Sequence, residues 1–81
     1  MNTIKIFGTG CPSCNQLEKL CFNILAENNI DADLQKVTDI KEIALAGVMS
    51  TPALMINGKI VLSGKVPSKE MLLKIITDNI N

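Results

Sequence analysis

The 81-residue sequence predicts an α/β fold with the element order strand–helix–strand–helix–strand–strand–helix. Two observations carry this prediction. Segments with the alternating apolar pattern of strands are interleaved with segments whose apolar residues recur at helical spacing. The last two strands are separated by Asn57-Gly58, the residue pair most typical of a two-residue β-hairpin. We therefore expect one domain over residues 1–81, with a four-stranded mixed sheet of order 2-1-3-4 and helices on both faces.

The N-terminal half is expected to form a parallel strand–helix–strand unit. Alternating apolar residues predict a first strand over residues 3–7, and a glycine on each side of Thr9 ends it. Residues 12–27 are predicted to form a helix, because one face carries a continuous apolar stripe: Leu17, Leu20, Cys21, Ile24 and Leu25. A second, half-exposed strand is expected over residues 30–37. The helical crossover should be right-handed, which places the two strands side by side.

The C-terminal half carries a short helix, a hairpin and a final helix. Asp39 and Glu42 form a capping-box pattern that opens the short helix, and Gly47 ends it. The hairpin strands are expected over residues 53–56 and 59–62. The final helix should begin after an N-cap serine and bury its apolar face, formed by Met71, Leu72, Ile75, Ile76 and Ile80.

Composition excludes several classes of function. Eight basic and eight acidic residues balance, and only two residues are aromatic, so neither a nucleic-acid surface nor a base-stacking platform is expected. Apolar runs stay short of the roughly 18 residues of a membrane span, and no signal peptide is visible. Three cysteines are an odd number, unlike a secreted disulfide scaffold. We therefore expect a cytoplasmic protein with reactive rather than structural thiols. We also expect it to be a monomer.

The most informative motif is Cys11-Pro12-Ser13-Cys14, which lies where the first strand gives way to the first helix. A helix N-terminus carries partial positive charge and unpaired N–H groups, both of which stabilise a thiolate. Proline suits the first helical position, because its missing N–H would be unpaired there anyway. We expect Cys11 to be the exposed nucleophile of disulfide exchange, and the more buried Cys14 to resolve the mixed disulfide.

Two segments together resemble the thioredoxin superfamily: residues 8–14, Gly-Thr-Gly-Cys-Pro-Ser-Cys, and residues 47–59, which run from Gly47 through Thr51-Pro52 to the Asn-Gly hairpin. The resemblance spans essentially the whole chain, and it is strongest to the small bacterial and archaeal members often called redox-active disulfide proteins. It implies the minimal thioredoxin-like fold and a protein disulfide oxidoreductase, thioredoxin- or glutaredoxin-like, that carries electrons in cell redox homeostasis.

The resemblance also implies particular sites and partners. The Thr51-Pro52 bond would be cis and lie beside the two cysteines, and Pro12, Ser13, Thr51 and Pro52 would bind substrate. Partners would be protein disulfides and a flavin- and NAD(P)H-dependent disulfide reductase, with no bound cofactor or metal. The chain departs from the family at Gly10, where thioredoxins usually have Trp, and at Ser13, where glutaredoxins usually have an aromatic residue. It also lacks a convincing match to the buried acid of thioredoxins.

Two other readings of the cysteines remain open. The CxxC pair suits copper(I), and heavy-metal-associated domains place such a pair similarly, although their chains end on a strand. A disulfide that only switches binding to a partner would make the chain an interaction domain. A structural zinc site would lack two ligands. Cys21 lies two helical turns from Cys14, about 10 Å away, which is beyond the roughly 7 Å between Cα atoms in a disulfide. We therefore expect it to be a buried apolar residue.

Overall fold

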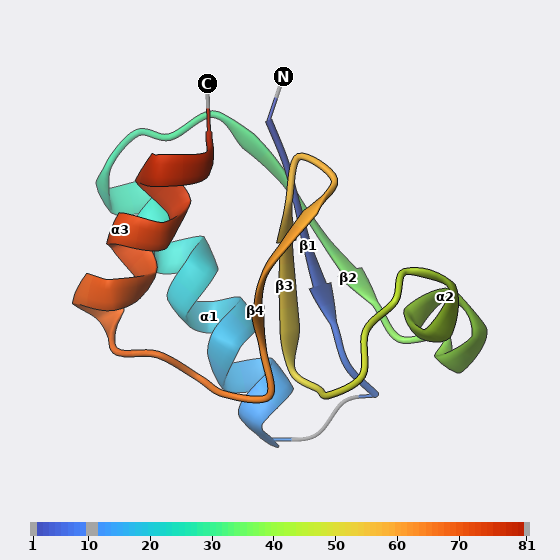
Figure 1. Ribbon diagram of the computed structural model, residues 1–81. Helices are drawn as coiled ribbons and strands as arrows, with labels where there is room; N and C mark the ends of the chain where they lie inside the picture. The colour runs from blue at the N-terminus through green and yellow to red at the C-terminus, as the bar shows by residue number, and fades with distance from the viewer. Residues whose placement is uncertain (1, 10–11, 81) are drawn as a thin grey trace.

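The computed structural model describes residues 2–9 and 12–80 and has the element order that the sequence predicts (Figure 1). The strands and helices, in chain order, are β1 (Asn2–Phe7), α1 (Pro12–Glu27), β2 (Ala32–Val37), α2 (Ile40–Leu45), β3 (Ala53–Ile56), β4 (Lys59–Ser63) and α3 (Lys69–Asn79).

β2 begins two residues later than the alternation suggests, because Ile30 takes part in the C-terminal cap of α1. The Ile30 N–H donates to the Leu25 carbonyl oxygen at 3.0 Å, across Asn29 in the left-handed region at φ 52°. This is a Schellman-type helix end, in which asparagine takes the place that glycine usually occupies.

The sheet has the strand order β2-β1-β3-β4, as predicted. β1 is parallel to β2 and antiparallel to β3, and β3 is antiparallel to β4. Asn57 and Gly58 both have positive φ, 50° and 85°, as a type I′ turn requires. Leu54 pairs with Leu62, but Met55 pairs with Ile60, so β4 carries one extra residue opposite β3.

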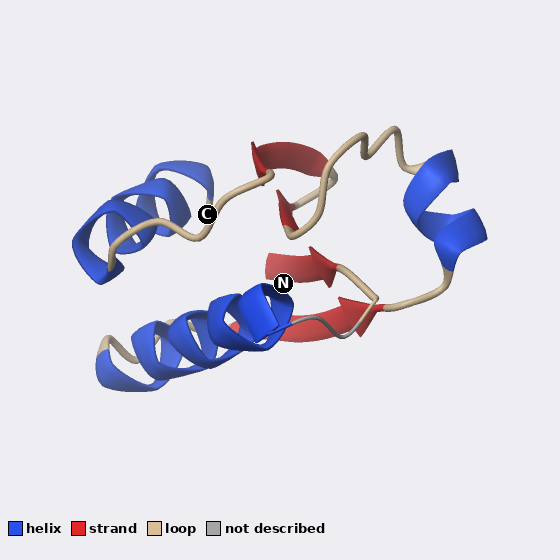
Figure 2. Ribbon diagram, turned by 90° about the horizontal axis from the view of Figure 1, so that it is seen from below, coloured by secondary structure: helices blue, strands red, loops and turns tan. Residues whose placement is uncertain are grey.

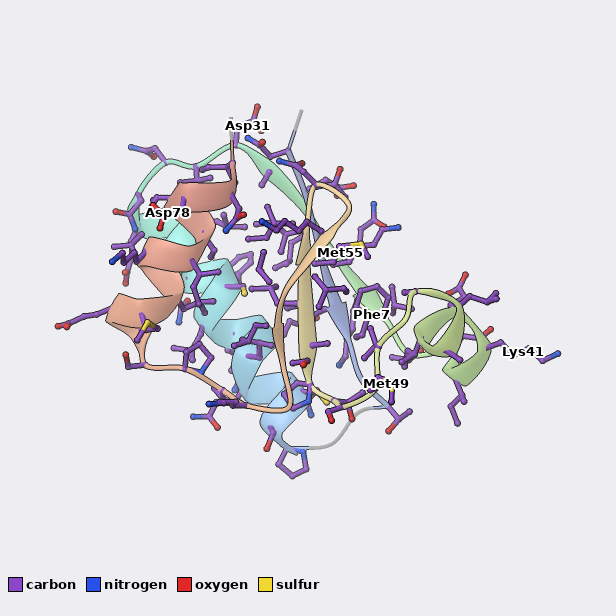
Figure 3. The ribbon with its side chains drawn as sticks, in the orientation of Figure 1. Phe7, Asp31, Lys41, Met49, Met55 and Asp78 are labelled. Carbon is purple, nitrogen blue, oxygen red and sulfur yellow. The ribbon has the colours of Figure 1, made fainter. Side chains whose placement is uncertain are left out.

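Helices lie on both faces of the sheet, which confirms that part of the predicted fold. α1 and α3 cover one face and α2 the other, as Figures 1 and 2 show. The larger core lies under α1 and α3 and contains Ile4, Ile6, Leu17, Cys21, Ile24, Leu25, Leu54, Ile56, Leu72 and Ile76. The smaller core lies under α2 and contains Phe7, Ile43 and Ala53. Figure 3 shows Phe7 on the side of the sheet that faces α2.

The predicted helix starts are confirmed by their caps. The Asp39 carboxylate accepts a hydrogen bond from the Lys41 N–H, and the Ser68 hydroxyl oxygen accepts one from the Met71 N–H. The prediction that Met71 is buried is wrong, because its side chain is 55% exposed. Met71 lies in the first turn of α3, where it lines an open groove with Leu62 and neighbouring residues instead of reaching the core. Within residues 2–9 and 12–80, none of the helices has the length and apolar character needed to cross a bilayer.

Candidate dithiol site

The first turn of α1 holds the part of the CxxC motif that the structure describes. Pro12 is the first residue of α1, as expected from its missing N–H, and both Pro12 and Ser13 are exposed. Cys14, by contrast, is completely buried. Cys11, the predicted nucleophile, lies outside the described residues, together with Gly10. The motif therefore places two substrate-binding candidates at the surface and one cysteine beneath them.

Gly8 forms the surface against which Cys14 packs. A Cβ atom built on Gly8 would lie 2.9 Å from the Cβ of Cys14 and still closer to its Sγ, so only glycine leaves room for this cysteine. The Gly8 N–H donates to the carbonyl oxygen of Val37 at 3.0 Å, which ties the residue to the end of β2. The loop before α1 is thus anchored where it touches the sulfur.

Pro52 lies at the same end of the sheet. The antiparallel pairing of β1 and β3 ends at Phe7 opposite Ala53, so Gly8 and Pro52 are the next residues outward on adjacent strands. Pro52 is buried, Thr51 is exposed, and the peptide bond between them is cis. Because Gly8 touches Cys14, the register brings the proline segment and this cysteine to the same end of the sheet. Figure 1 shows the start of α1 and the segment before β3 together there.

Ser50 and Gly64 also lie at this end of the sheet, and the sequence did not identify either as a site residue. The Gly64 N–H donates to the Pro52 carbonyl oxygen at 2.8 Å, and a Cβ on Gly64 would lie 3.3 Å from the Cβ of Ser50. The sequence marks Gly64 only through the pair Ser63-Gly64, and such a pair is typical of the end of any hairpin.

A polar cluster spans the first turn of α1 and the end of β2. The Lys36 ammonium donates to Asn15 Oδ1 at 2.8 Å and lies 3.7 Å from Glu18 Oε1. Sequence reasoning missed this cluster, since Asn15 and Lys36 are far apart in the chain. Among the described residues no carboxylate is buried, in keeping with the absence of a match to the buried acid of thioredoxins.

Cys21 lies deep in the larger core, as predicted. Its side chain has no exposed surface, and burial, assisted by the negative charge of Glu18, raises the pKa of its thiol from 9.0 to about 12. A thiol with such a pKa stays protonated at neutral pH and is a poor nucleophile. Cys21 therefore packs as one of the residues of the larger core.

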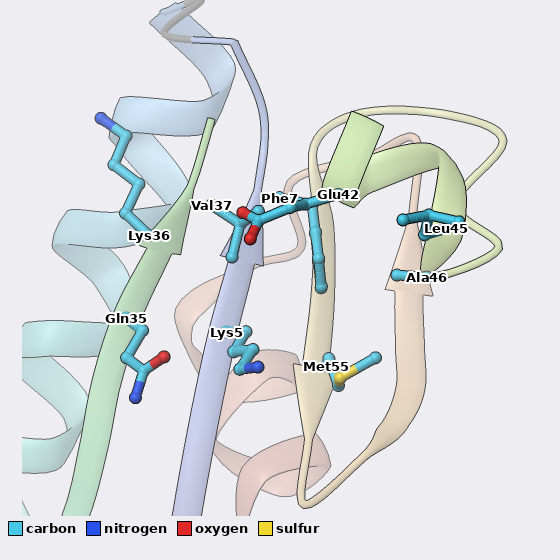
Figure 4. Close-up of a pocket in the computed structure, with 9 residues that line it drawn as sticks. All are labelled: Lys5, Phe7, Gln35, Lys36, Val37, Glu42, Leu45, Ala46 and Met55. Atoms are coloured by element: carbon cyan, nitrogen blue, oxygen red, sulfur yellow. The ribbon is translucent and has the colours of Figure 1, made fainter. Parts of the chain in front are cut away.

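The other face of the sheet has a cavity of about 440 Å³ beside α2, shown in Figure 4. Gly8, Cys14 and Pro52 do not line it; the lining residues are Lys5, Phe7, Gln35, Lys36, Val37, Glu42, Leu45, Ala46 and Met55. Over residues 2–9 and 12–80, no group of three or more His, Cys, Asp and Glu residues is arranged to hold a metal.

The sheet order and the arrangement of Cys14, Gly8 and Pro52 define a class of small α/β protein with a CxxC motif at the start of its first helix. The sequence profile of one family, described as Thioredoxin domain, matches residues 2–77. The chain belongs to this thioredoxin domain family.

Two archaeal relatives are similar over most of the chain. A protein named Thioredoxin from Methanothermobacter thermautotrophicus is 38% identical over 77 residues, which are 95% of this chain and 100% of the relative. A protein of the same name from Methanocaldococcus jannaschii is 47% identical over 70 residues, which are 86% of this chain and 80% of the relative. The expected resemblance to small archaeal thioredoxin-like proteins is thereby confirmed, and it supports thiol–disulfide oxidoreduction as the general activity.

Solved structures confirm the fold. A structure described as that of a malarial protein matches 100% of this chain and 99% of its own, with a TM-score of 0.69 and 18% identity. The solution structure of oxidised thioredoxin from Plasmodium falciparum matches 95% of this chain and 79% of its own, with a TM-score of 0.67 and 18% identity.

Proposed function

We propose that this protein is a monomeric, cytoplasmic oxidoreductase that exchanges disulfides through the dithiol of Cys11 and Cys14. The observation that carries the proposal is the burial of Cys14 against Gly8, at the sheet end where Pro52 adjoins Gly8. A buried thiol in the first turn of a 16-residue helix is placed to act second, after a partner has reacted at the surface.

The chemistry starts with Cys11 as a thiolate. Its sulfur attacks one sulfur of a substrate disulfide, a new S–S bond forms, and the substrate disulfide breaks to release one thiolate, which takes up a proton. Cys14 then loses its proton and attacks the Cys11 sulfur, which releases the second substrate thiol. The substrate gains two electrons and two protons, and the dithiol becomes a disulfide. The N-terminal dipole of α1 favours the thiolate, and the first turn of α1 has no acidic residue to oppose it.

Protein disulfides are the proposed substrates, bound between the start of α1 and the segment before β3. Pro12, Ser13 and Thr51 are exposed and would contact the partner, while the buried Pro52 would shape the surface beneath it. The oxidised protein would be reduced again by a flavin- and NAD(P)H-dependent disulfide reductase.

Two serine variants test the proposal. Cys11→Ser should abolish reduction of insulin disulfides, because the attacking thiolate is lost. Cys14→Ser should accumulate mixed disulfides with partners, because the resolving thiol is lost, and mass spectrometry of the complexes would detect them. Cys21→Ala serves as the matched control and should retain reduction, since the Cys21 thiol is buried and protonated. Equal accumulation of mixed disulfides by the Cys11 and Cys14 variants would contradict the assigned roles.

A redox titration distinguishes this function from soft-metal binding. The midpoint potential of the dithiol would be measured in glutathione and dithiothreitol buffers, with and without copper(I). A two-electron transition that copper(I) leaves in place supports the oxidoreductase. Capture of copper(I) at picomolar or tighter affinity would instead support a metal-binding domain.

A further inference from the structure

We infer that Lys36 is a positioning residue for the dithiol: Asn15 and Glu18 hold its ammonium beside the first turn of α1. The inference rests on the proposed function, because it assigns a role to a residue that does not itself react. The supporting observation is that Lys36, at the end of β2, contacts Asn15 and Glu18 on the helix that carries Cys14.

The geometry gives the ammonium a defined place. Lys36 donates to Asn15 at 2.8 Å, and Asn15 directly follows Cys14 in the first turn of α1. The lysine side chain is 29% exposed and that of Glu18 is 38% exposed, so neither is fully surrounded by water. Lys36 also lines the α2 cavity, but in Figure 4 its side chain extends away from the other lining residues. Its ammonium makes its contacts with Asn15 and Glu18 of α1.

Val37, the next residue of β2, contacts the residue against which Cys14 packs. The Val37 carbonyl oxygen accepts a hydrogen bond from Gly8, whose Cα adjoins the Cys14 side chain. Two consecutive residues of β2 thus contact the first turn of α1, which contains Cys14, and Gly8, against which Cys14 packs. Lys36 holds the helix through a side chain, and Val37 holds the preceding loop through the backbone.

The position of the ammonium has an electrostatic consequence. Through a single hydrogen bond to the adjacent residue, it lies no more than about 10 Å from the Cα of Cys14, which is close to the Debye length at physiological salt. A cation at that distance favours a thiolate, whereas Glu18 opposes it. At Cys21, further along α1, the negative charge of Glu18 adds to burial in raising the pKa of the thiol.

Other charged groups near the site are placed less directly. Lys19 follows Glu18 on α1 and is exposed, and Lys65 is exposed beyond the end of β4. Lys5 and Glu42 line the cavity on the opposite face of the sheet. Lys36, by contrast, donates a hydrogen bond of 2.8 Å to Asn15 in the first turn of α1.

The test is the pH dependence of iodoacetamide alkylation of the reduced protein, followed at the thiol that reacts first. Lys36→Met keeps the stem but removes the charge, so the midpoint of the profile should rise by about 0.3–1 pH unit. Glu18→Gln removes the opposing charge and should lower the midpoint. Lys36→Arg keeps the charge and should leave the midpoint near that of the wild type. All midpoints should converge in high salt, because screening weakens both charges.

Lys41→Met is the matched control, because Figure 3 shows this exposed lysine of α2 pointing away from the molecule. A purely structural role for Lys36 would lower thermal stability without moving the midpoint, so melting by circular dichroism is measured for each variant. An unchanged midpoint in Lys36→Met, or an equal shift in Lys41→Met, would overturn the inference. Glu18→Gln and Lys36→Arg decide the matter if Lys36→Met does not fold. Insulin reduction by the wild type tests the proposed function separately, since alkylation requires no substrate.

Discussion

At the scale of single residues, Gly8 determines where the sulfur of Cys14 can lie. Gly8 has no Cβ, and the Cys14 side chain occupies the space that a Cβ would need. Its role does not come from a left-handed backbone, because Gly8 is not among the positive-φ glycines. The glycine is therefore required by contact, not by conformational freedom.

Gly8→Ala should both destabilise the protein and slow disulfide exchange. Overpacking of a buried contact costs about 1–3 kcal/mol, and displacement of the resolving thiol should slow its reaction by roughly tenfold or more. Urea unfolding and the rate at which the mixed disulfide resolves measure the two effects. Gly47→Ala is the control, because Gly47 has φ 81° but open space around it. Gly47→Ala should lower the free energy of unfolding by about 1–2 kcal/mol, because of backbone strain. It should resolve the mixed disulfide at the wild-type rate. A normal rate in Gly8→Ala would contradict the contact argument.

Cys21 makes stability depend on pH. Its pKa is raised by burial from 9.0 to about 12 in the folded protein, so the folded state keeps a proton that the unfolded state releases between these values. The stabilising contribution is complete below pH 9.0 and is lost as the pH rises towards 12, by up to about 1.4 kcal/mol per unit.

Cys21→Val removes this dependence and leaves the other titrating groups in place. We expect the free energy of unfolding of the wild type to fall more steeply than that of the variant between about pH 8 and about pH 10.5. Urea unfolding at the two pH values measures the difference. Parallel declines in both proteins would show that the Cys21 thiol titrates normally.

At the scale of elements, Asn57 ties the hairpin of β3 and β4 to two other segments, β1 and the end of α3. Its Oδ1 accepts from the Thr3 N–H at 2.9 Å, and its Nδ2 donates to Asn2 Oδ1 at 3.0 Å and to the Asn79 carbonyl oxygen at 3.2 Å. Asn2 in turn donates to the Asp31 carbonyl oxygen at 3.3 Å. One turn residue thus links β1, β3 and the end of α3 at the end of the sheet away from the dithiol.

Asn57→Asp should destabilise the protein by about 1–3 kcal/mol, because the carboxylate cannot donate and would face two acceptors. Chemical denaturation measures the loss. Asn23→Asp on the exposed surface of α1 is the control, and it should change stability by less than about 0.5 kcal/mol. Insulin reduction should persist in both variants where they are folded. Loss of activity in a folded Asn57→Asp protein would show that the two ends of the sheet are coupled.

At the scale of the whole molecule, the sheet separates two unequal cores. The larger core is closed by α1 and α3, while the six-residue α2 covers only part of the other face. Three of the exposed large apolar side chains lie on α2 or just after it: Ile40, Leu45 and Met49. The Cα radius of gyration is 11.5 Å, close to the roughly 12 Å expected of a compact chain of this length.

The protein should be a monomer in solution. Small-angle scattering of the reduced protein should give a radius of gyration near 11.5 Å, plus the contribution of its hydration layer. The radius of gyration should not change with protein concentration, because a monomer has no association equilibrium. Lys69→Ala, which removes an exposed ion pair with Glu27, is a control that should leave the radius unchanged. A radius that grows with concentration would indicate self-association through the exposed apolar residues.

The helices, the strands, the sheet order and the start of α1 at Pro12 could all be predicted from the sequence. Apolar periodicity, the Asn-Gly turn and the capping residues act locally, so neighbouring residues are enough to reveal them. The prediction that Met71 is buried was wrong. Periodicity shows that Met71 shares a helix face with the core residues, but it does not show how far the neighbouring elements extend along that face. Three contacts could not be predicted from the sequence: Gly8 accommodates Cys14, Pro52 lies across from Gly8, and Lys36 reaches Asn15. These contacts join residues from different elements, and they exist only when the register of the sheet and the packing of α1 bring those elements together.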